Sequence, residues 1–274
     1  MLGYAAGGKV LRSVAFLPGL LVVGVVAGGC ASTPDDGLLA STEVVRQLPR
    51  ETGDRVEVAR FSRDQVGGLP AGGWQPYVIL PSKPRTDYQL VRLDGEVALQ
   101  AEADESASGK VRRIRIEPQA YPIVEWRWRI DNLVPGADKR VASLDDSPVR
   151  LIVSFHGDAA RLDFQDRMQF RLARAISGRS LPYATLMYGW SNTLPVGTVV
   201  HNPHTDRVRS IVVASGNEGV GEWRDYRRNL LEDYRMAFGE EPWDIVAVGV
   251  MTDADNTRQK ARSHYGDITF LKGP

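Results

Sequence analysis

Oxygen-bearing side chains follow directly on an apolar run that ends at Met251. Asp253, Asp255 and Asn256 lie there, and Asp267 lies on the last predicted strand. Carboxylate, amide and backbone carbonyl oxygens are the ligands that calcium prefers. Two interpretations stay open for this segment: a structural calcium site built from these four residues, or a turn whose carboxylates accept backbone hydrogen bonds. No other cofactor is expected from the sequence.

A second group of charged residues precedes another apolar run. Asp145, Asp146 and Arg150 lie close together at the start of the run 149–155. A pair of carboxylates can act as general acid and base, and the same groups can clamp the hydroxyls of a sugar. The alternative is an ion network, because charges that become buried must be paired.

A third group combines Arg228 with Glu232 and Asp233 in a segment of helical pattern. Arg228 and Glu232 stand four residues apart, the spacing at which side chains meet on one helix face. The same two interpretations apply, and the structural one is favoured: an ion network that fixes the helix to the rest of the domain. Arg228 and Asp233 remain candidate ligand-binding residues beside Asp145, Asp146 and Arg150.

The six tryptophans are a further source of binding chemistry, since an exposed indole face packs against the apolar face of a pyranose ring. Most tryptophans are nonetheless core residues. Trp126 and Trp128 alternate on one strand and are expected inside. Trp190 and Trp223 lie among glycines and polar residues and are the candidates for exposure.

Several classes of protein are excluded. The sequence has no Gly-x-Ser-x-Gly elbow and no His-Glu-x-x-His motif, which argues against serine hydrolases and zinc proteases. Its 34 basic and 34 acidic residues balance, so it has no electrostatic footprint for nucleic acid.

Cys30 is the only cysteine, and its position is typical of a bacterial lipoprotein signal. Before it lie the basic residues Lys9 and Arg12, an apolar run over 14–27 and the small residues 27–29. The apolar run is shorter than the roughly 20 residues that a spanning helix needs. We therefore expect cleavage before Cys30, acylation of its thiol and attachment to the membrane through the acyl chains.

The predicted organisation is a signal peptide over 1–29, a lipid-anchored tether over 30–45 and one domain over 46–274. Ala31, rather than Asp, follows Cys30, which favours the outer membrane with the domain facing the periplasm. An acylated Cys30 would leave the domain without a thiol, which excludes disulfides and thiolate metal sites.

Apolar and polar residues alternate with period two through most of the domain, as in half-buried antiparallel strands. The clearest case is 124–131, and ten further runs are predicted as strands. They cover 55–61, 77–80, 88–93, 97–103, 111–116, 149–155, 186–190, 210–214, 245–251 and 267–271.

Two segments have helical periodicity instead, with apolar residues four apart that are expected to face the core. These are Phe164, Met168, Leu172 and Ile176 in 163–176, and Tyr226, Leu230, Tyr234 and Phe238 in 223–238. Many short strands with two inserted helices predict a mainly β fold, a jelly-roll-like antiparallel sandwich.

Eight blocks of residues, in order from about Phe61 to the end, resemble the bacterial family catalogued as domain of unknown function 3047. They are Gly72-Gly73-Trp74, Leu99–Glu102 with Ser106–Gly109, Trp126-Arg127-Trp128, Asp145-Asp146 with Arg150, Ser215-Gly216 with Trp223, Arg228-Asn229 with Glu232–Tyr234 and Phe238-Gly239, Thr252–Thr257, and Tyr265–Ile268. The resemblance implies no assigned activity. It implies a layout similar to galactose-binding-like jelly rolls, a fold common among carbohydrate-binding modules.

The leading functional hypothesis is therefore a lipid-anchored envelope protein that binds a glycan or another envelope component without catalysis. A polysaccharide or peptidoglycan hydrolase that uses a pair among Asp145, Asp146, Glu232 and Asp233 is the alternative. A third hypothesis is an assembly factor that holds another envelope protein. An exposed aromatic platform would favour the first hypothesis, two cleft carboxylates with unpaired oxygens the second, and a broad exposed apolar patch the third.

The anchor prediction can be tested by changing Cys30 to Ser. The substitution removes the acylation site, so the protein should leave the membrane fraction or accumulate as an unprocessed precursor. Fractionation and immunoblotting measure both outcomes. Processing and membrane attachment identical to those of the wild type would contradict the prediction.

Overall fold

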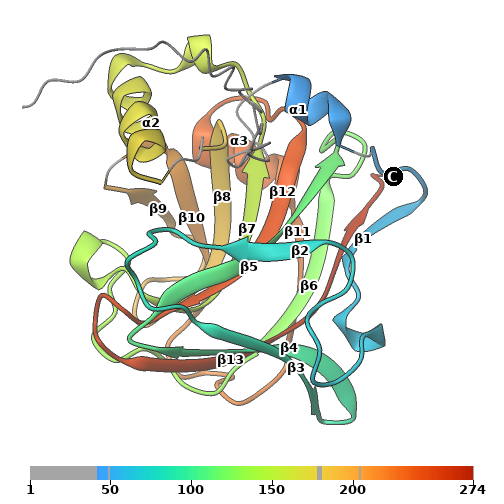
Figure 1. Ribbon diagram of the computed structural model, residues 1–274, viewed down its shortest axis with the longest axis vertical. Coiled ribbons are helices and arrows are strands. Elements are labelled where there is room, and N and C mark those ends of the chain that lie inside the picture. The colour runs from blue at the N-terminus through green and yellow to red at the C-terminus, as the bar shows by residue number, and fades with distance from the viewer. Residues whose placement is uncertain (1–41, 49, 178–180, 204, 274) are drawn as a thin grey trace, which may run out of the picture. The chain divides into compact units, whose positions relative to one another are not determined.

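The computed structural model describes residues 42–48, 50–177, 181–203 and 205–273 (Figure 1). The predicted signal peptide, Cys30 and most of the tether lie outside the described residues, so these remain predictions. Residues 35–274 form one compact unit, and the main core cluster runs from Val56 to Phe270. That unit therefore carries a hydrophobic core of its own.

The first of two sheets has the strand order β11-β6-β13-β4-β3, and β1 pairs with β13 at its end. Every pairing in it is antiparallel. Its strands are β1 (Arg55–Ala59), β3 (Asp87–Leu93), β4 (Glu96–Asp104), β6 (Ile123–Ile130), β11 (Arg224–Asn229) and β13 (Lys260–Leu271).

The second sheet has the order β2-β5-β12-β7-β8-β10-β9. Only β8 and β10 run parallel to each other. Its strands are β2 (Trp74–Tyr77), β5 (Ala107–Ile116), β7 (Ser147–Phe155), β8 (Ala184–Ser191), β9 (Val199–Asn202), β10 (Thr205–Ser215) and β12 (Ile245–Asp253). The two sheets face each other in Figure 1 and form the predicted jelly-roll-like sandwich.

The clearest predicted strand is confirmed as β6. Its residues alternate between buried and half-buried positions along the whole strand. Trp126 and Trp128 are buried and lie opposite Ile268 and Tyr265 of β13. The period-two pattern of the sequence therefore sets which face of the first sheet meets the core.

The central strands of the second sheet, β7 and β12, are buried at every residue. One face of β12 meets the main core through Val248 and Val250. Its other face is covered in part by α1 (Thr42–Gln47), where Val45 packs with Val246 and Ala247. Because these strands are buried on both faces, their sequences are continuous apolar runs rather than alternating apolar and polar residues.

The predicted helices are both present, with different boundaries. The first is α2 (Phe164–Ser177) and the second is α3 (Leu230–Phe238). The preceding residues 224–229 form β11 instead, because they pair with β6 and place Tyr226 opposite Trp126. No helix of the described residues is both long and apolar enough to cross a membrane.

The expected orientation of α2 is wrong. Phe164, Met168 and Leu172 are 73%, 47% and 54% exposed, whereas Phe170 packs against the main core and Asp166 is buried. The side chain of Ile176 lies outside the described residues. The apolar stripe at four-residue spacing therefore faces solvent.

The α3 helix is capped at both ends and tied to the sandwich by a buried carboxylate. Asn229 accepts a hydrogen bond from the backbone N–H of Glu232, and Gly239 ends the helix at a φ of 70°. Asp233 accepts hydrogen bonds from Arg228 of β11 and, at 2.8 Å, from the hydroxyl of Tyr188 on β8. Its role here is the structural one that the sequence favours, with Asp233 rather than Glu232 as the partner of Arg228.

Asp233→Asn should lower the free energy of unfolding by about 2–4 kcal/mol, because it leaves the Arg228 guanidinium without its buried counter-charge. The matched control is Glu232→Gln, which neutralises the exposed neighbouring carboxylate and should change stability by less than about 0.5 kcal/mol. Urea unfolding followed by circular dichroism measures both. Equal losses for the two variants would show that Asp233 does not anchor α3.

Candidate functional site

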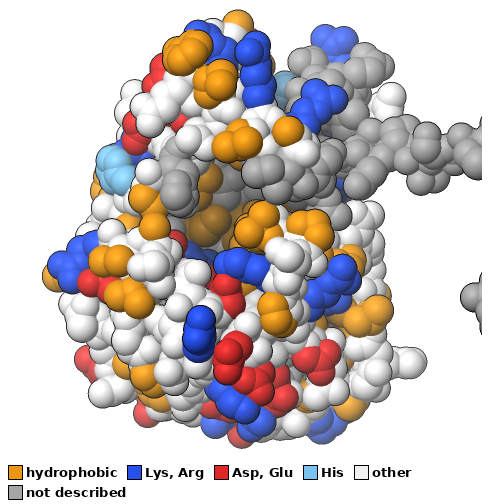
Figure 2. All heavy atoms as spheres, turned by 60° about the vertical axis from the view of Figure 1, so that its left-hand side comes forward, with side chains coloured by type: hydrophobic (Ala, Val, Ile, Leu, Met, Phe, Trp, Pro, Cys, Tyr) orange, Lys and Arg blue, Asp and Glu red, His pale blue; other side chains and the backbone are white. Residues whose placement is uncertain are grey.

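A cleft of about 360 Å³ opens on the second sheet, with lining residues from β5 across the central strands to β9, and Figure 2 shows a hollow with charged side chains at its rim. We call it the Arg150 cleft. Its apolar walls include Ile79, Leu80, Met187, Val208 and Met251. Its charged lining consists of Lys83, Lys139, Asp145, Arg150, Asp253 and Asp255. Apolar walls around a few convergent polar groups are typical of small-molecule sites.

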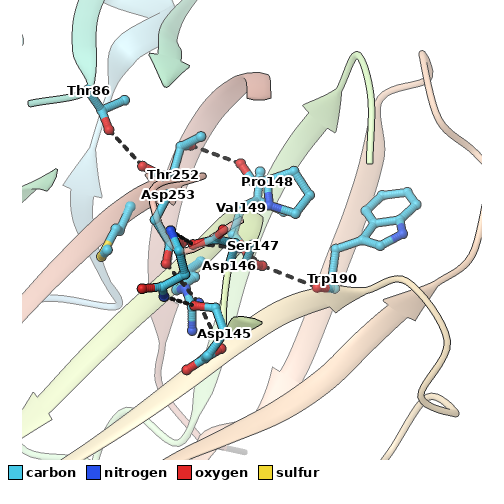
Figure 3. A network of polar contacts seen from close by, with 12 residues as sticks. Thr86, Asp145, Asp146, Ser147, Pro148, Val149, Trp190, Thr252 and Asp253 are labelled. Atoms are coloured by element: carbon cyan, nitrogen blue, oxygen red, sulfur yellow. Dashed lines mark hydrogen bonds and ion pairs between the residues drawn. The ribbon is translucent and has the colours of Figure 1, made fainter. Parts of the chain in front are cut away.

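Arg150 is the centre of the charged lining. Its Nε donates to Asp253 Oδ1 and its Nη2 to Asp253 Oδ2, both at 2.9 Å. Nη2 also donates to the carboxylate and the backbone carbonyl of Asp145. The antiparallel pairing of β12 with β7 places Asp253 opposite Ser147, so the end of one strand meets the start of the other (Figure 3).

Asp146 is buried beside this pair, and both oxygens of its carboxylate accept hydrogen bonds. It accepts hydrogen bonds from the backbone N–H groups of Asn256 and Thr257, at 3.2 and 2.7 Å, and from the Thr257 hydroxyl. A carboxylate therefore caps backbone donors of the segment after β12. That carboxylate comes from the loop before β7 rather than from the turn itself.

Asp255 turns back from the same segment into the cleft. One of its carboxylate oxygens forms an ion pair with Lys83, which lies between β2 and β3. Its other oxygen, Oδ1, is buried and has no hydrogen-bond partner among the described residues. A buried acceptor without a donor is uncommon in native proteins and costs roughly 1–3 kcal/mol.

Lys139 is the second unsatisfied group of the cleft. It lies in the loop between β6 and β7, is only 4% exposed, and its Nζ has no hydrogen-bond partner in the described part of the chain. Gly189 of β8 leaves room for it: a Cβ at that position would lie 3.3 Å from Lys139 Nζ. The cleft therefore holds one buried donor and one buried acceptor that no described residue pairs.

These surroundings shift the pKa values of the charged groups in different directions. Burial, reinforced by the charge of Arg150, lowers the pKa of Lys139 to about 7. Burial also raises the pKa of Asp253 to about 6, against the opposing effect of Arg150. Asp145 is half-buried, and the charges of Arg150 and Lys139 outweigh the effect of that burial and lower its pKa. Clustered, perturbed groups in a cleft are characteristic of functional sites.

The geometry also defines which residues could hold a cation. One oxygen each of Asp146, Asp253 and Asp255 lie within 4.8 Å of one another. Arg150 and Lys83 form ion pairs with Asp253 and Asp255, so protein cations already neutralise two of the three carboxylates. Calcium binding at Asp253, Asp255 and Asn256 stays a prediction, with Asp146 as the additional carboxylate.

Asp267 does not join this cluster. It lies on β13 of the first sheet, where its two oxygens accept hydrogen bonds from the backbone and the hydroxyl of Ser62. The expected fourth calcium ligand therefore holds the short turn after β1 in place.

The structure brings Asp145, Asp146 and Arg150 together, as the sequence predicted. It adds Asp253, which the sequence did not place with them. Arg228 and Asp233 do not line the cleft; they hold α3. Sequence reasoning missed Lys139 and Lys83. No spacing rule points to them, because each reaches the cleft from a loop that only the folded chain places beside β12.

The expected exposure of Trp190 is wrong. Its ring is 1% exposed, and its indole N–H donates to the carbonyl of Gly216. Trp223 is half-buried under the guanidinium of Arg127, 4.6 Å from the ring centroid. Trp243 is the exposed tryptophan of the described residues. Neither predicted ring lines the Arg150 cleft, so aliphatic side chains form its apolar walls instead.

Lys139→Met should stabilise the protein, because it replaces a buried, unpaired ammonium with an apolar chain of similar length. The folded-state pKa of about 7 lies below the ordinary 10.5. The wild type therefore carries the full penalty below pH 7 and loses it as the pH rises towards 10.5. The gain should be several kcal/mol at pH 6 and should shrink steadily up to pH 10.5.

Urea unfolding across that pH range measures the gain, with Lys260→Met as the control. Lys260 is an exposed lysine paired with Asp104, so its loss should change stability by less than about 0.5 kcal/mol. A gain for Lys139→Met that does not depend on pH would contradict the assigned environment.

Comparison with solved structures finds carbohydrate-active enzymes of low similarity. The chain is 10% identical to a cellulase derived from Rhodothermus marinus Cel12A, with a TM-score of 0.40, covering 79% of this chain and 100% of that one. It is 8% identical to a family 12 xyloglucanase from Bacillus licheniformis, with a TM-score of 0.41, covering 79% of this chain and 99% of that one. It is 9% identical to the glycoside hydrolase domain of Endo-D from Streptococcus pneumoniae, with a TM-score of 0.31, and 73% of this chain is covered. The chain spans only 21% of that structure. These likenesses concern the layout of the chain, and no activity is taken from them.

A search of curated proteins finds no significant relative. A family model does match, over residues 72–269, which include most of both sheets and the residues of the Arg150 cleft. The chain therefore belongs to the family described as protein of unknown function DUF3047.

Proposed function

We propose that the protein binds a hydroxyl-rich ligand, a glycan segment or another polar component of the bacterial envelope, in the Arg150 cleft and without catalysis. One observation carries the proposal: the cleft contains a buried donor, Lys139 Nζ, and a buried acceptor, Asp255 Oδ1, that no described residue satisfies. A hydroxyl group both donates and accepts, so a ligand with several hydroxyls can complete both.

The rest of the cleft supports this choice. Arg150 and Asp253 hold each other through two parallel hydrogen bonds, which gives a rigid polar floor that needs no rearrangement when a ligand enters. The apolar walls formed by residues such as Leu80 and Met251 can contact the C–H faces of a sugar ring. Their aliphatic character replaces the aromatic platform that the sequence suggested.

The geometry favours binding over hydrolysis. Both oxygens of Asp253 are held by Arg150, and Asp146 is held by the turn that contains Asn256 and Thr257. Glu232 and Asp233 lie on α3 and do not line the cleft. A glycosidase needs two carboxyl groups that are free to exchange a proton or to attack the sugar. Of the four carboxylates that the hydrolase alternative names, Asp145 alone lines the cleft, and Arg150 holds one of its oxygens.

The expected location is the periplasmic side of the outer membrane, through acylation of Cys30. A protein held there meets envelope glycans and lipid headgroups at high local concentration. The predicted anchor and the proposed ligand class therefore fit one another, and each can be tested without the other.

The test is a screen of residues 35–274 on an array of bacterial envelope glycans, including peptidoglycan fragments and lipopolysaccharide oligosaccharides. We expect reproducible binding that falls at least about tenfold in Lys139→Met and Asp255→Asn, since each removes one buried partner of the ligand. Lys260→Met and Trp223→Ala should bind as the wild type does, because neither residue lines the cleft.

Two results would overturn the proposal. Binding that is lost in Trp223→Ala and kept in Lys139→Met would move the site away from the cleft. Release of shortened sugars from a bound glycan, detected by mass spectrometry, would show hydrolysis instead of simple binding.

A further inference from the structure

The α2 helix presents an apolar stripe to solvent rather than to the core. Successive residues of an α-helix are rotated by about 100°, so Phe164, Met168 and Leu172 share one face. Phe170 and Asp166 lie on the opposite face, where Phe170 packs on the core and Asp166 accepts a hydrogen bond from Thr205 at 2.6 Å. The α2 helix therefore contacts the sandwich through the face that carries Asp166 and Phe170, and the three stripe residues take no part in that contact.

Exposure of this kind is costly and unusual. The three stripe residues are each about half exposed or more, and together they form a continuous apolar face over two turns. A surface helix of a globular protein normally turns such a face inward. Contiguous exposed apolar patches mark interaction sites rather than ordinary surface.

Charge identifies the kind of partner. Arg167, Arg171 and Arg174 are all exposed and lie along one flank of the stripe at the same helical spacing. The only acidic residue of α2 is Asp166, which is buried on the other side. An apolar face bordered by arginines is the pattern of a helix that lies in the interface of an anionic membrane.

Figure 2 shows hydrophobic and basic side chains next to each other at the top of the molecule, the region that α2 occupies in Figure 1. The α1 helix, where the described chain begins, lies at the same end in Figure 1. Eleven residues separate Cys30 from Thr42, a length that reaches at most about 40 Å. If Cys30 is acylated, the end that carries α2 is held near the bilayer.

We propose that α2 docks on the surface of an anionic phospholipid bilayer, with Phe164, Met168 and Leu172 inserted among the acyl chains and the arginines on lipid phosphates. This contact would give the protein a second attachment besides the lipid anchor. Two weak attachments are far stronger together than either one alone. The docking does not depend on what the Arg150 cleft binds.

The test is co-sedimentation of residues 35–274, which lack the acylation site, with vesicles. One set contains phosphatidylglycerol and phosphatidylcholine, and the other contains phosphatidylcholine alone. We expect binding to the anionic vesicles that weakens as salt rises. The triple variant Phe164→Ser, Met168→Ser and Leu172→Ser should bind at least about tenfold more weakly.

Two further double variants separate the contribution of the arginines to vesicle binding from that of exposed apolar residues elsewhere on the surface. Arg171→Gln combined with Arg174→Gln should weaken binding to anionic vesicles about tenfold or more, because each arginine near a charged membrane contributes about 1 kcal/mol. Leu69→Ser combined with Val196→Ser is the control, since both residues are exposed, at 71% and 63%, and neither lies on α2. Their loss should leave vesicle binding unchanged.

Absence of binding to the anionic vesicles would overturn the proposal, as would binding that the triple variant does not reduce. Self-association of the wild type that the triple variant abolishes, without vesicle binding, would show that the stripe is a contact between copies of the chain. All substituted residues are exposed, so melting temperatures within a few degrees of the wild type are expected and can be measured on the same samples.

Discussion

The site depends on the ion pairs that the buried guanidinium of Arg150 forms with two carboxylates. Arg150 lies on β7 and holds Asp253 at the end of β12 and Asp145 in the preceding loop. An isolated charge in this position would be prohibitively costly, and two carboxylates around one guanidinium make burial possible. The ion network thereby fixes the two central strands of the second sheet against the loop that brings Lys139 into the cleft.

Behind this network, a chain of buried hydroxyls joins the two sheets. Thr252 donates to the carbonyl of Pro148, and its hydroxyl lies 2.8 Å from that of Tyr265 on β13. Thr86 donates to the carbonyl of Thr252 (Figure 3). Buried side-chain atoms without a partner also occur elsewhere among the described residues, for example the indole nitrogens of Trp126 and Trp128. Lys139 and Asp255 differ from these because both line one cleft, which is the reason for assigning them a ligand.

The sequence was most informative where one physical rule acts alone. Period-two alternation located β6 because one face of that strand meets the core along its whole length. The same reasoning failed for residues 224–229, whose apparent helical spacing is overridden by pairing with β6. It also failed for α2, where the periodicity correctly indicates an amphipathic helix but cannot say which side the apolar face meets.

The site divides in the same way. Asp145, Asp146 and Arg150 are close in sequence, so their clustering was visible there. Their partnership with Asp253 depends on the register between β7 and β12, and the position of Lys139 depends on the path of a loop. Trp190 shows the limit of composition as a guide, because glycine-rich surroundings did not prevent its burial.

Ligand binding in the cleft depends on Lys139 being a buried ammonium without a partner among the described residues. A carbon-13 NMR titration of its side chain, assigned with Lys139→Met, measures this directly. The account predicts a midpoint near pH 7, well below the ordinary 10.5, that moves upwards when a ligand binds and pairs the ammonium. A midpoint near 10.5 in the free protein would show that Lys139 is solvated or paired. The cleft would then contain no unsatisfied donor at Lys139.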